Sequence, residues 1–209
     1  MGSDISGKNG GLGLTPAQLV RTEAAALEAL AVRLEGEMSA GFERAVDLVI
    51  RCGEGRGRVV VTGMGKSGII AQKIAAILRS SCSPANFMHP GDAIHGEIGM
   101  LSPGSVVIAL TYSGETKELL QLLHFFEDFD VKLITLTSSA SSSLAKASDV
   151  SLDCSVEKEA CVFGLSPTAS TSVMLALGDA LALTTSLRNG KTANDLENLH
   201  RKRGMPRFQ

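Results

Sequence analysis

The chain has 209 residues, 44% of them hydrophobic, which is long enough for one sizeable domain and too short for two comfortable ones. Its 20 Lys and Arg against 22 Asp and Glu give a formal net charge of −2, so no basic excess exists to neutralise a nucleic-acid backbone. Apolar runs fall short of the roughly 18 residues of a membrane span and no signal sequence is evident, which favours a cytoplasmic protein. The four cysteines form no CxxC pair, so neither a zinc site nor a disulfide framework is expected.

The N-terminal part predicts a leader followed by helix. Residues 1–14 hold five glycines and little to bury, so we expect a disordered leader or a cloning remnant there, followed by a single domain over 15–209. A helix is predicted from Pro16, because Thr15, Pro16 and Gln18 form the pattern of a capping box. Helical spacing of apolar residues continues to a turn at 53–57, either as one helix or as two that break near 36–41.

After this turn, short apolar runs alternate with helical stretches. The predicted strands are 59–62, 85–88, 106–111, 133–137 and 150–153, and the predicted helices lie near 66–81, 115–128, 141–147 and 166–188. Runs such as VVIAL and LITL are apolar at every position, as expected of strands covered on both faces. The pattern therefore predicts a doubly wound α/β fold with a five-stranded parallel sheet flanked by helices. Ligands bind such sheets at the carboxyl ends of the strands, so chemistry is expected in the loops that begin at Gly63, His89, Thr111 and Thr137.

The first of these loops reads GMGKSG and formally matches a dinucleotide-binding pattern. That reading lacks its acidic partner, because the second strand ends with His89-Pro90, and a Walker A loop would need glycine where Val60 stands. What remains is a glycine turn that exposes backbone N–H groups at a helix N-terminus beside Lys66 and Ser67, which suits an anion. The alternative is a tight strand-to-helix turn with a solvated lysine.

The loop after the third strand reads TYSGET and surrounds a helix start with hydroxyl groups. Thr111, Ser113 and Thr116, with free backbone amides and the positive helix end, predict a cradle for a phosphate monoester. Ser113 is also compatible with a plain N-cap role, and the two interpretations are not exclusive because an anion binds where a cap sits.

Five segments together carry a resemblance to a known family: GMGKSG, HPGDAIHGEIGM, SGET, VEKEA and GLSPTASTSVMLALGDALA. In this order they resemble the sugar-isomerase (SIS) domain of arabinose-5-phosphate isomerases, over about residues 19–200. The resemblance implies a flavodoxin-like SIS domain that interconverts arabinose 5-phosphate and ribulose 5-phosphate through an enediolate, in the biosynthesis of the lipopolysaccharide sugar Kdo. It implies no metal and no organic cofactor, and a homotetramer with sites between subunits.

The resemblance also supplies catalytic residues: Lys66, Glu115, Glu159 and His200, with His89 as a further candidate, while Ser67 joins the hydroxyls of the phosphate cradle. These residue types fit the reaction, because aldose-ketose isomerisation needs a base that moves a proton between C1 and C2 and a cation near the developing enediolate charge. Without the resemblance, Glu159 reads as part of a solvated loop.

Two departures from the family pattern stand at the C-terminal end. Family members usually read His-Pro-Gly-Gly at the last catalytic histidine, whereas Arg201, Lys202 and Arg203 follow His200 here. Many members also carry a pair of CBS modules, and with Gln209 as the last residue the expectation is the single-domain form. Two alternatives stay open: an isomerase for a hexulose or heptulose phosphate, and a non-catalytic sugar-phosphate sensor. The joint presence of Lys66, Glu115, Glu159 and His200 favours catalysis, because phosphate binding alone needs only the hydroxyl loops.

Overall fold

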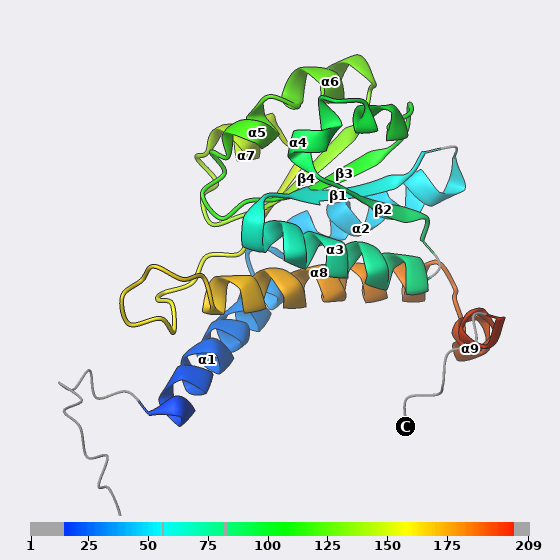
Figure 1. The fold of residues 1–209 in the computed structure, drawn as a ribbon. Coiled ribbons are helices and arrows are strands. Elements are labelled where there is room, and N and C mark those ends of the chain that lie inside the picture. Colours follow the sequence, from blue (N-terminus) through cyan, green and yellow to red (C-terminus); the bar gives the residue numbers. More distant parts are fainter. Residues whose placement is uncertain (1–14, 56, 82, 203–209) are drawn as a thin grey trace, which may run out of the picture.

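The computed structural model describes residues 15–55, 57–81 and 83–202, with side chains up to Asn198. The leader predicted for 1–14 lies outside the described residues. Figure 1 shows a sheet between two layers of helices, with α1, α2, α3 and α8 over one face and α4, α5, α6 and α7 over the other.

The sheet has five parallel strands in the order β2-β1-β3-β4-β5, which confirms the predicted doubly wound, flavodoxin-like fold. The strands are β1 (Val59–Gly63), β2 (Ala85–Met88), β3 (Val106–Leu110), β4 (Lys132–Thr137) and β5 (Val150–Asp153), each within one residue of its predicted bounds. The chain leaves β1 for β2 on one side and returns to β3 on the other. The GMGKSG and TYSGET loops therefore flank the point where the strand order reverses, which is where ligands bind such sheets.

One face of the sheet is covered by the long helices α1 (Pro16–Glu35), α2 (Ser39–Glu54), α3 (Gly65–Ser80) and α8 (Ala169–Arg188). The predicted capping box starts α1, with Thr15 N donating to Gln18 Oε1 at 2.7 Å and Gln18 N donating to Thr15 Oγ1 at 3.3 Å. A turn at residues 36–38 separates α1 from α2, so the interpretation as two helices is correct.

The other face carries only short helices: α4 (Pro90–Ala93), the 3₁₀ turn η1 (Glu97–Met100), α5 (Lys117–Leu120), α6 (Leu123–Asp128) and α7 (Ser143–Ala147). The single helix predicted for 115–128 is wrong. Leu122 N donates to Leu119 O, three residues back instead of four, at 3.0 Å, and this tighter turn separates α5 from α6. The structure also adds α9 (Ala193–Lys202), which apolar spacing did not predict.

Helix α8 packs against the other three long helices of its layer, α1, α2 and α3. Among the described residues it is the one helix whose length and hydropathy would suit a membrane span, and half of that stretch is buried inside the domain. At Gly178 a Cβ atom would overlap the side chain of Ile74, so α8 and α3 approach one another closely. The apolar side chains on the buried side of α8 therefore pack in the core of this domain.

Candidate active site

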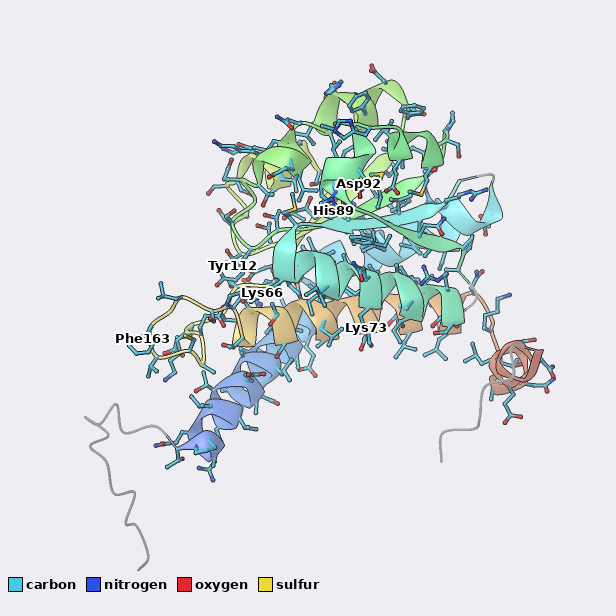
Figure 2. All side chains as sticks on the ribbon, viewed as in Figure 1. Lys66, Lys73, His89, Asp92, Tyr112 and Phe163 are labelled. Carbon is cyan, nitrogen blue, oxygen red and sulfur yellow. The ribbon has the colours of Figure 1, made fainter. Side chains whose placement is uncertain are left out.

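The GMGKSG turn sets α3 tightly against the end of β1. Gly65 has a φ of +58°, and a Cβ on Gly68 would lie 2.6 Å from the carbonyl oxygen of Gly63, so only glycine suits both positions. Lys66 is exposed in the first turn of α3 and lies at the edge where β1 ends (Figure 2). Ser67 Oγ lies 3.9 Å from Met174 Sδ, so the N-terminal turn of α3 contacts α8.

The hydroxyl groups of the TYSGET turn have unequal environments. Thr111 is buried, and its Oγ1 lies 2.7 Å from Thr116 Oγ1 and accepts from Gly114 N at 3.2 Å. Thr116, not Ser113, is the N-cap residue of α5. Ser113 is exposed, and its Oγ accepts from Glu115 N at 3.2 Å. The two threonines therefore hold the turn, while the Ser113 hydroxyl is exposed at its surface.

The serine-rich loop after β4, which begins at Thr137 where the sequence predicted chemistry, joins this turn through residues that the sequence analysis did not assign. Gly114 has a φ of +70°, and a Cβ there would overlap Ser142, the N-cap of α7. Glu115 Oε1 accepts from Ser143 N at 2.7 Å. The hydrogen bonds from Ser143, and then the charge of Lys146, hold the pKa of Glu115 below its ordinary value of 4.5. The serine-rich stretch 138–143 is the sequence feature that points to this loop.

Glu159 caps the N-terminus of α8. Its Oε2 accepts from Thr168 N at 2.7 Å, from Thr168 Oγ1 at 2.8 Å and from Ser170 N at 3.3 Å. Desolvation disfavours the charged carboxylate, yet the hydrogen bonds from Ser170 and Thr168 outweigh it, so the pKa of Glu159 falls below 4.5. The side chain is half-buried and held at a positive helix end, so the solvated-loop interpretation is wrong.

These residues meet at one edge of the sheet. Glu159 caps α8 at Thr168 and Ser170, and Met174, one turn further along, touches Ser67 of α3. The N-terminal turns that carry Lys66 and bind Glu159 therefore lie next to each other, and both direct a positive helix end toward this edge. The described residues contain no group of three His, Cys, Asp or Glu side chains arranged to hold a metal ion.

The two predicted catalytic histidines have different positions relative to this group. His89 follows β2, where its Nδ1 accepts from Gly91 N at 3.2 Å as the N-cap of α4 and lies 3.8 Å from Asp92 Oδ2. His200 belongs to α9, and its side chain is outside the described residues. Helix α9 follows the C-terminal end of α8, whereas Glu159 caps the other end (Figure 1). The 20 residues of α8 span about 30 Å, so the structure does not bring α9 to the Glu159 edge of the same chain.

Comparison with known proteins decides the family. Residues 54–184, more than half of the chain, match the SIS domain family. The chain belongs to this family. The SIS domain is 46% identical over 159 residues to arabinose 5-phosphate isomerase KdsD of Pseudomonas aeruginosa, covering 76% of this chain and 48% of that protein. It is 43% identical over 167 residues to KdsD of Escherichia coli K12, covering 80% of this chain and 50% of that protein. The chain thus spans about half the length of the curated relatives it matches.

Solved structures extend the comparison to nearly the whole SIS domain. A putative phosphosugar isomerase involved in capsule formation from Bacteroides fragilis aligns with a TM-score of 0.81 at 33% identity, covering 88% of this chain and 94% of that one. A protein of Escherichia coli CFT073 in complex with arabinose 5-phosphate aligns with a TM-score of 0.78 at 35% identity, covering 88% of this chain and 96% of that one. The SIS resemblance found in the sequence is confirmed.

Proposed function

We propose that this SIS domain interconverts arabinose 5-phosphate and ribulose 5-phosphate, a step toward Kdo in lipopolysaccharide biosynthesis. Two relatives named KdsD, at 43% and 46% identity, and a similar structure in complex with arabinose 5-phosphate support this assignment. The observation that carries it is the placement of Glu159. Its carboxylate is fixed at the N-terminus of α8, beside the turn of α3 that holds Lys66.

The substrate phosphate binds between the TYSGET turn and the first turn of α3. Ser113 and Ser67 supply hydroxyl donors, and backbone N–H groups at the start of α3 add to them. Thr111 and Thr116 act mainly by shaping the turn, because their hydroxyls bond each other. This site needs little formal positive charge, since helix ends and neutral donors carry most of the interaction.

Glu159 is the base that moves the proton between C1 and C2. Its lowered pKa keeps it ionised at neutral pH, and because Oε2 takes the three hydrogen bonds of the cap, Oε1 is the oxygen that faces the substrate. The Lys66 ammonium stabilises the negative charge of the enediolate. Glu115, His89 and His200 transfer protons to and from the substrate oxygens. Neither a metal nor an organic cofactor takes part.

His200 reaches the site from a second copy of the chain. The assembly is a homotetramer, and it acts in the cytoplasm. The separation of α9 from Glu159 along α8 supports this, as do large apolar side chains that α8 and the loop before it leave exposed: Phe163 at 70%, Leu165 at 83% and Leu187 at 73%. The ligand is a small sugar phosphate, and neither nucleic acid nor membrane is a partner.

Turnover of a panel of sugar phosphates tests the proposal. We expect ribulose 5-phosphate from arabinose 5-phosphate, with exchange of the C2 proton into deuterated water. Faster turnover of a hexulose or heptulose phosphate would identify that sugar phosphate as the substrate instead. Tight binding of arabinose 5-phosphate without exchange or turnover would instead establish a sensor.

A further inference from the structure

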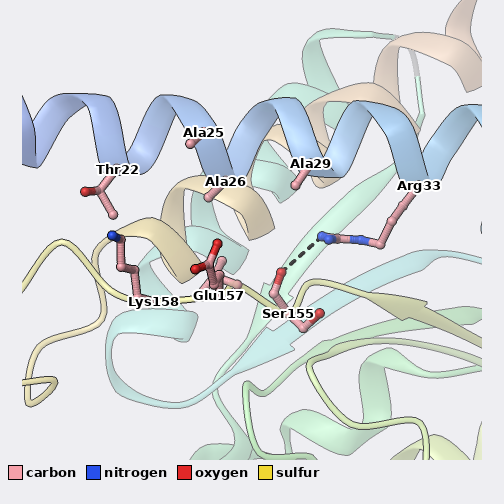
Figure 3. A pocket seen from close by; sticks show the side chains of 9 residues that line it. Thr22, Ala25, Ala26, Ala29, Arg33, Ser155, Glu157 and Lys158 are labelled. Carbon is pink, nitrogen blue, oxygen red and sulfur yellow. Dashed lines mark hydrogen bonds between the residues drawn. The ribbon is translucent and has the colours of Figure 1, made fainter.

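The segment that carries Glu159 connects β5 to α8 and runs beside α1 (Figure 3). A cavity of about 90 Å³ separates the two, lined by Ser155–Lys158 and, on the helix, by Thr22, Ala25, Ala26, Ala29 and Arg33. The alanines are small enough to leave this space open. Val156 and Ala26 pack against the core at this level, and the cavity leaves the rest of the stretch with room to move relative to α1.

A polar contact holds the segment where it leaves β5. Arg33 Nη2 donates to the carbonyl oxygen of Ser155 at 3.1 Å, and Arg33 Nε lies 3.3 Å from Asp153 Oδ2 in an ion pair. The Asp153 carboxylate in turn accepts from Ser155 N at 2.8 Å and from Ser155 Oγ at 3.0 Å. The Arg33 side chain is 16% exposed and that of Asp153 is 41% exposed, so solvent screens this ion pair in part.

A second polar contact holds the other end of the segment. Ser172 Oγ donates to Glu23 Oε2 of α1 at 2.6 Å. Ser172 lies in the first turn of α8, next to Thr168 and Ser170, whose N–H groups bind Glu159. Helix α1 thus contacts both ends of the segment, and the cavity lies against the stretch that follows Arg33's contact.

We propose that Arg33 and Glu23 are positioning residues for Glu159, because they fix both ends of the segment that carries it. This inference rests on the proposed function of Glu159 as the base. A displacement of about 1 Å at a reacting group is enough to slow a reaction roughly 100-fold. Loss of either contact frees the segment to move into the adjoining cavity, and the carboxylate moves with it. The phosphate site is built on other loops and keeps its geometry.

Steady-state kinetics of α1 variants tests the effect on the reaction. Arg33→Met and Glu23→Ala lower kcat roughly 10- to 100-fold with KM within about twofold, as expected for a misplaced base. Glu23→Gln keeps an acceptor oxygen for Ser172 and restores most of kcat. Arg21→Met and Glu28→Ala, at exposed positions of the same helix, serve as matched controls with unchanged kcat. In a Glu159→Gln background, Arg33→Met lowers the residual kcat no further if Arg33 acts through Glu159, and an undiminished second loss would overturn the proposal.

Hydrogen exchange of the backbone amides gives a readout that needs no substrate. In Arg33→Met and Glu23→Ala the amides of residues 155–170 lose protection, while those of the central strands keep it. Unchanged protection, or lost protection with unchanged kcat, would overturn the positioning role. A wild-type protein without isomerase activity would refute the proposed function instead, and the exchange pattern would still decide whether α1 holds the segment.

Discussion

The hydroxyl oxygens of Thr111 and Thr116 lie 2.7 Å apart and share one hydrogen bond across the TYSGET turn. One of the pair is buried, and it also accepts the N–H of Gly114. A partly buried hydrogen bond therefore stabilises the turn that carries Ser113. Thr111 and Thr116 hold the turn, whereas Ser113, two or three positions away from them, is exposed.

Ser113→Ala is expected to raise KM for phosphorylated substrates with little change in the thermal midpoint. A hydrogen bond to a charged group contributes about 1.5–3 kcal/mol, so KM rises roughly 10- to 150-fold. Thr116→Val raises KM as well, but it also lowers the free energy of unfolding by about 1 kcal/mol because Thr111 loses its partner. Steady-state kinetics beside thermal unfolding distinguishes the two. Unchanged KM in Ser113→Ala would mean that the phosphate binds elsewhere.

Glu159→Gln is expected to lower kcat by roughly 10²- to 10⁴-fold, the usual contribution of a general base, with little change in KM. Glutamine keeps an oxygen that accepts the Thr168 N–H, so the cap of α8 survives in part. Exchange of the substrate C2 proton with deuterated water should disappear together with turnover. Glu157→Gln, an exposed neighbour in the same segment, is the control. Retained exchange in Glu159→Gln would assign the base to another residue.

The pKa of Glu159 also predicts how stability depends on pH. The folded state lowers this pKa below its ordinary value of 4.5, so the charged carboxylate stabilises the fold above pH 4.5, and this contribution disappears as the pH falls through the folded pKa. The difference in unfolding free energy between the wild type and Glu159→Gln should therefore be largest near neutral pH and shrink in acid. Urea unfolding across this range measures it. A difference that grows in acid would contradict the capping role.

Gly114→Ala is expected to destabilise the domain by about 2–4 kcal/mol, since a positive φ and steric overlap add up. The new methyl group would meet Ser142 and push the TYSGET turn away from α7. Gly99→Ala is the matched control, because nothing lies within 4 Å of the added atom and φ is not positive there. Urea unfolding compares the two variants. Equal stability would show that the α7 loop yields to the methyl group.

Mixed oligomers test the origin of His200. If this side chain comes from a second copy, inactive Glu159→Gln and inactive His200→Ala chains, refolded together, regain up to about a quarter of wild-type turnover through random pairing. A histidine acting within its own chain predicts no recovery. Light scattering of each variant before mixing confirms that both assemble.

The sequence predicted the strands well because short, mainly apolar runs are bounded by turn residues, and the run VVIAL between Ser105 and Thr111 is apolar at every position. It did not predict the break between α5 and α6, since the apolar spacing continues across Gln121 and Leu122 and only the hydrogen bonds change partner. The two candidate anion-binding loops followed from local chemistry. The contact of Glu115 with Ser143, 28 residues later, did not, because it depends on how two loops meet at the end of the folded sheet.

The close approach of Gly178 and Ile74 sets where α8 and α3 touch inside the core. Lys66 lies eight residues before Ile74 on α3, and the cap that binds Glu159 lies about as far before Gly178 on α8. A rotation at the crossing is thus magnified at the two helix ends, about 12 Å away at 1.5 Å per residue. A side chain larger than glycine at residue 178 is therefore expected to change the spacing of these two groups from inside the core, because it would push α3 away from α8.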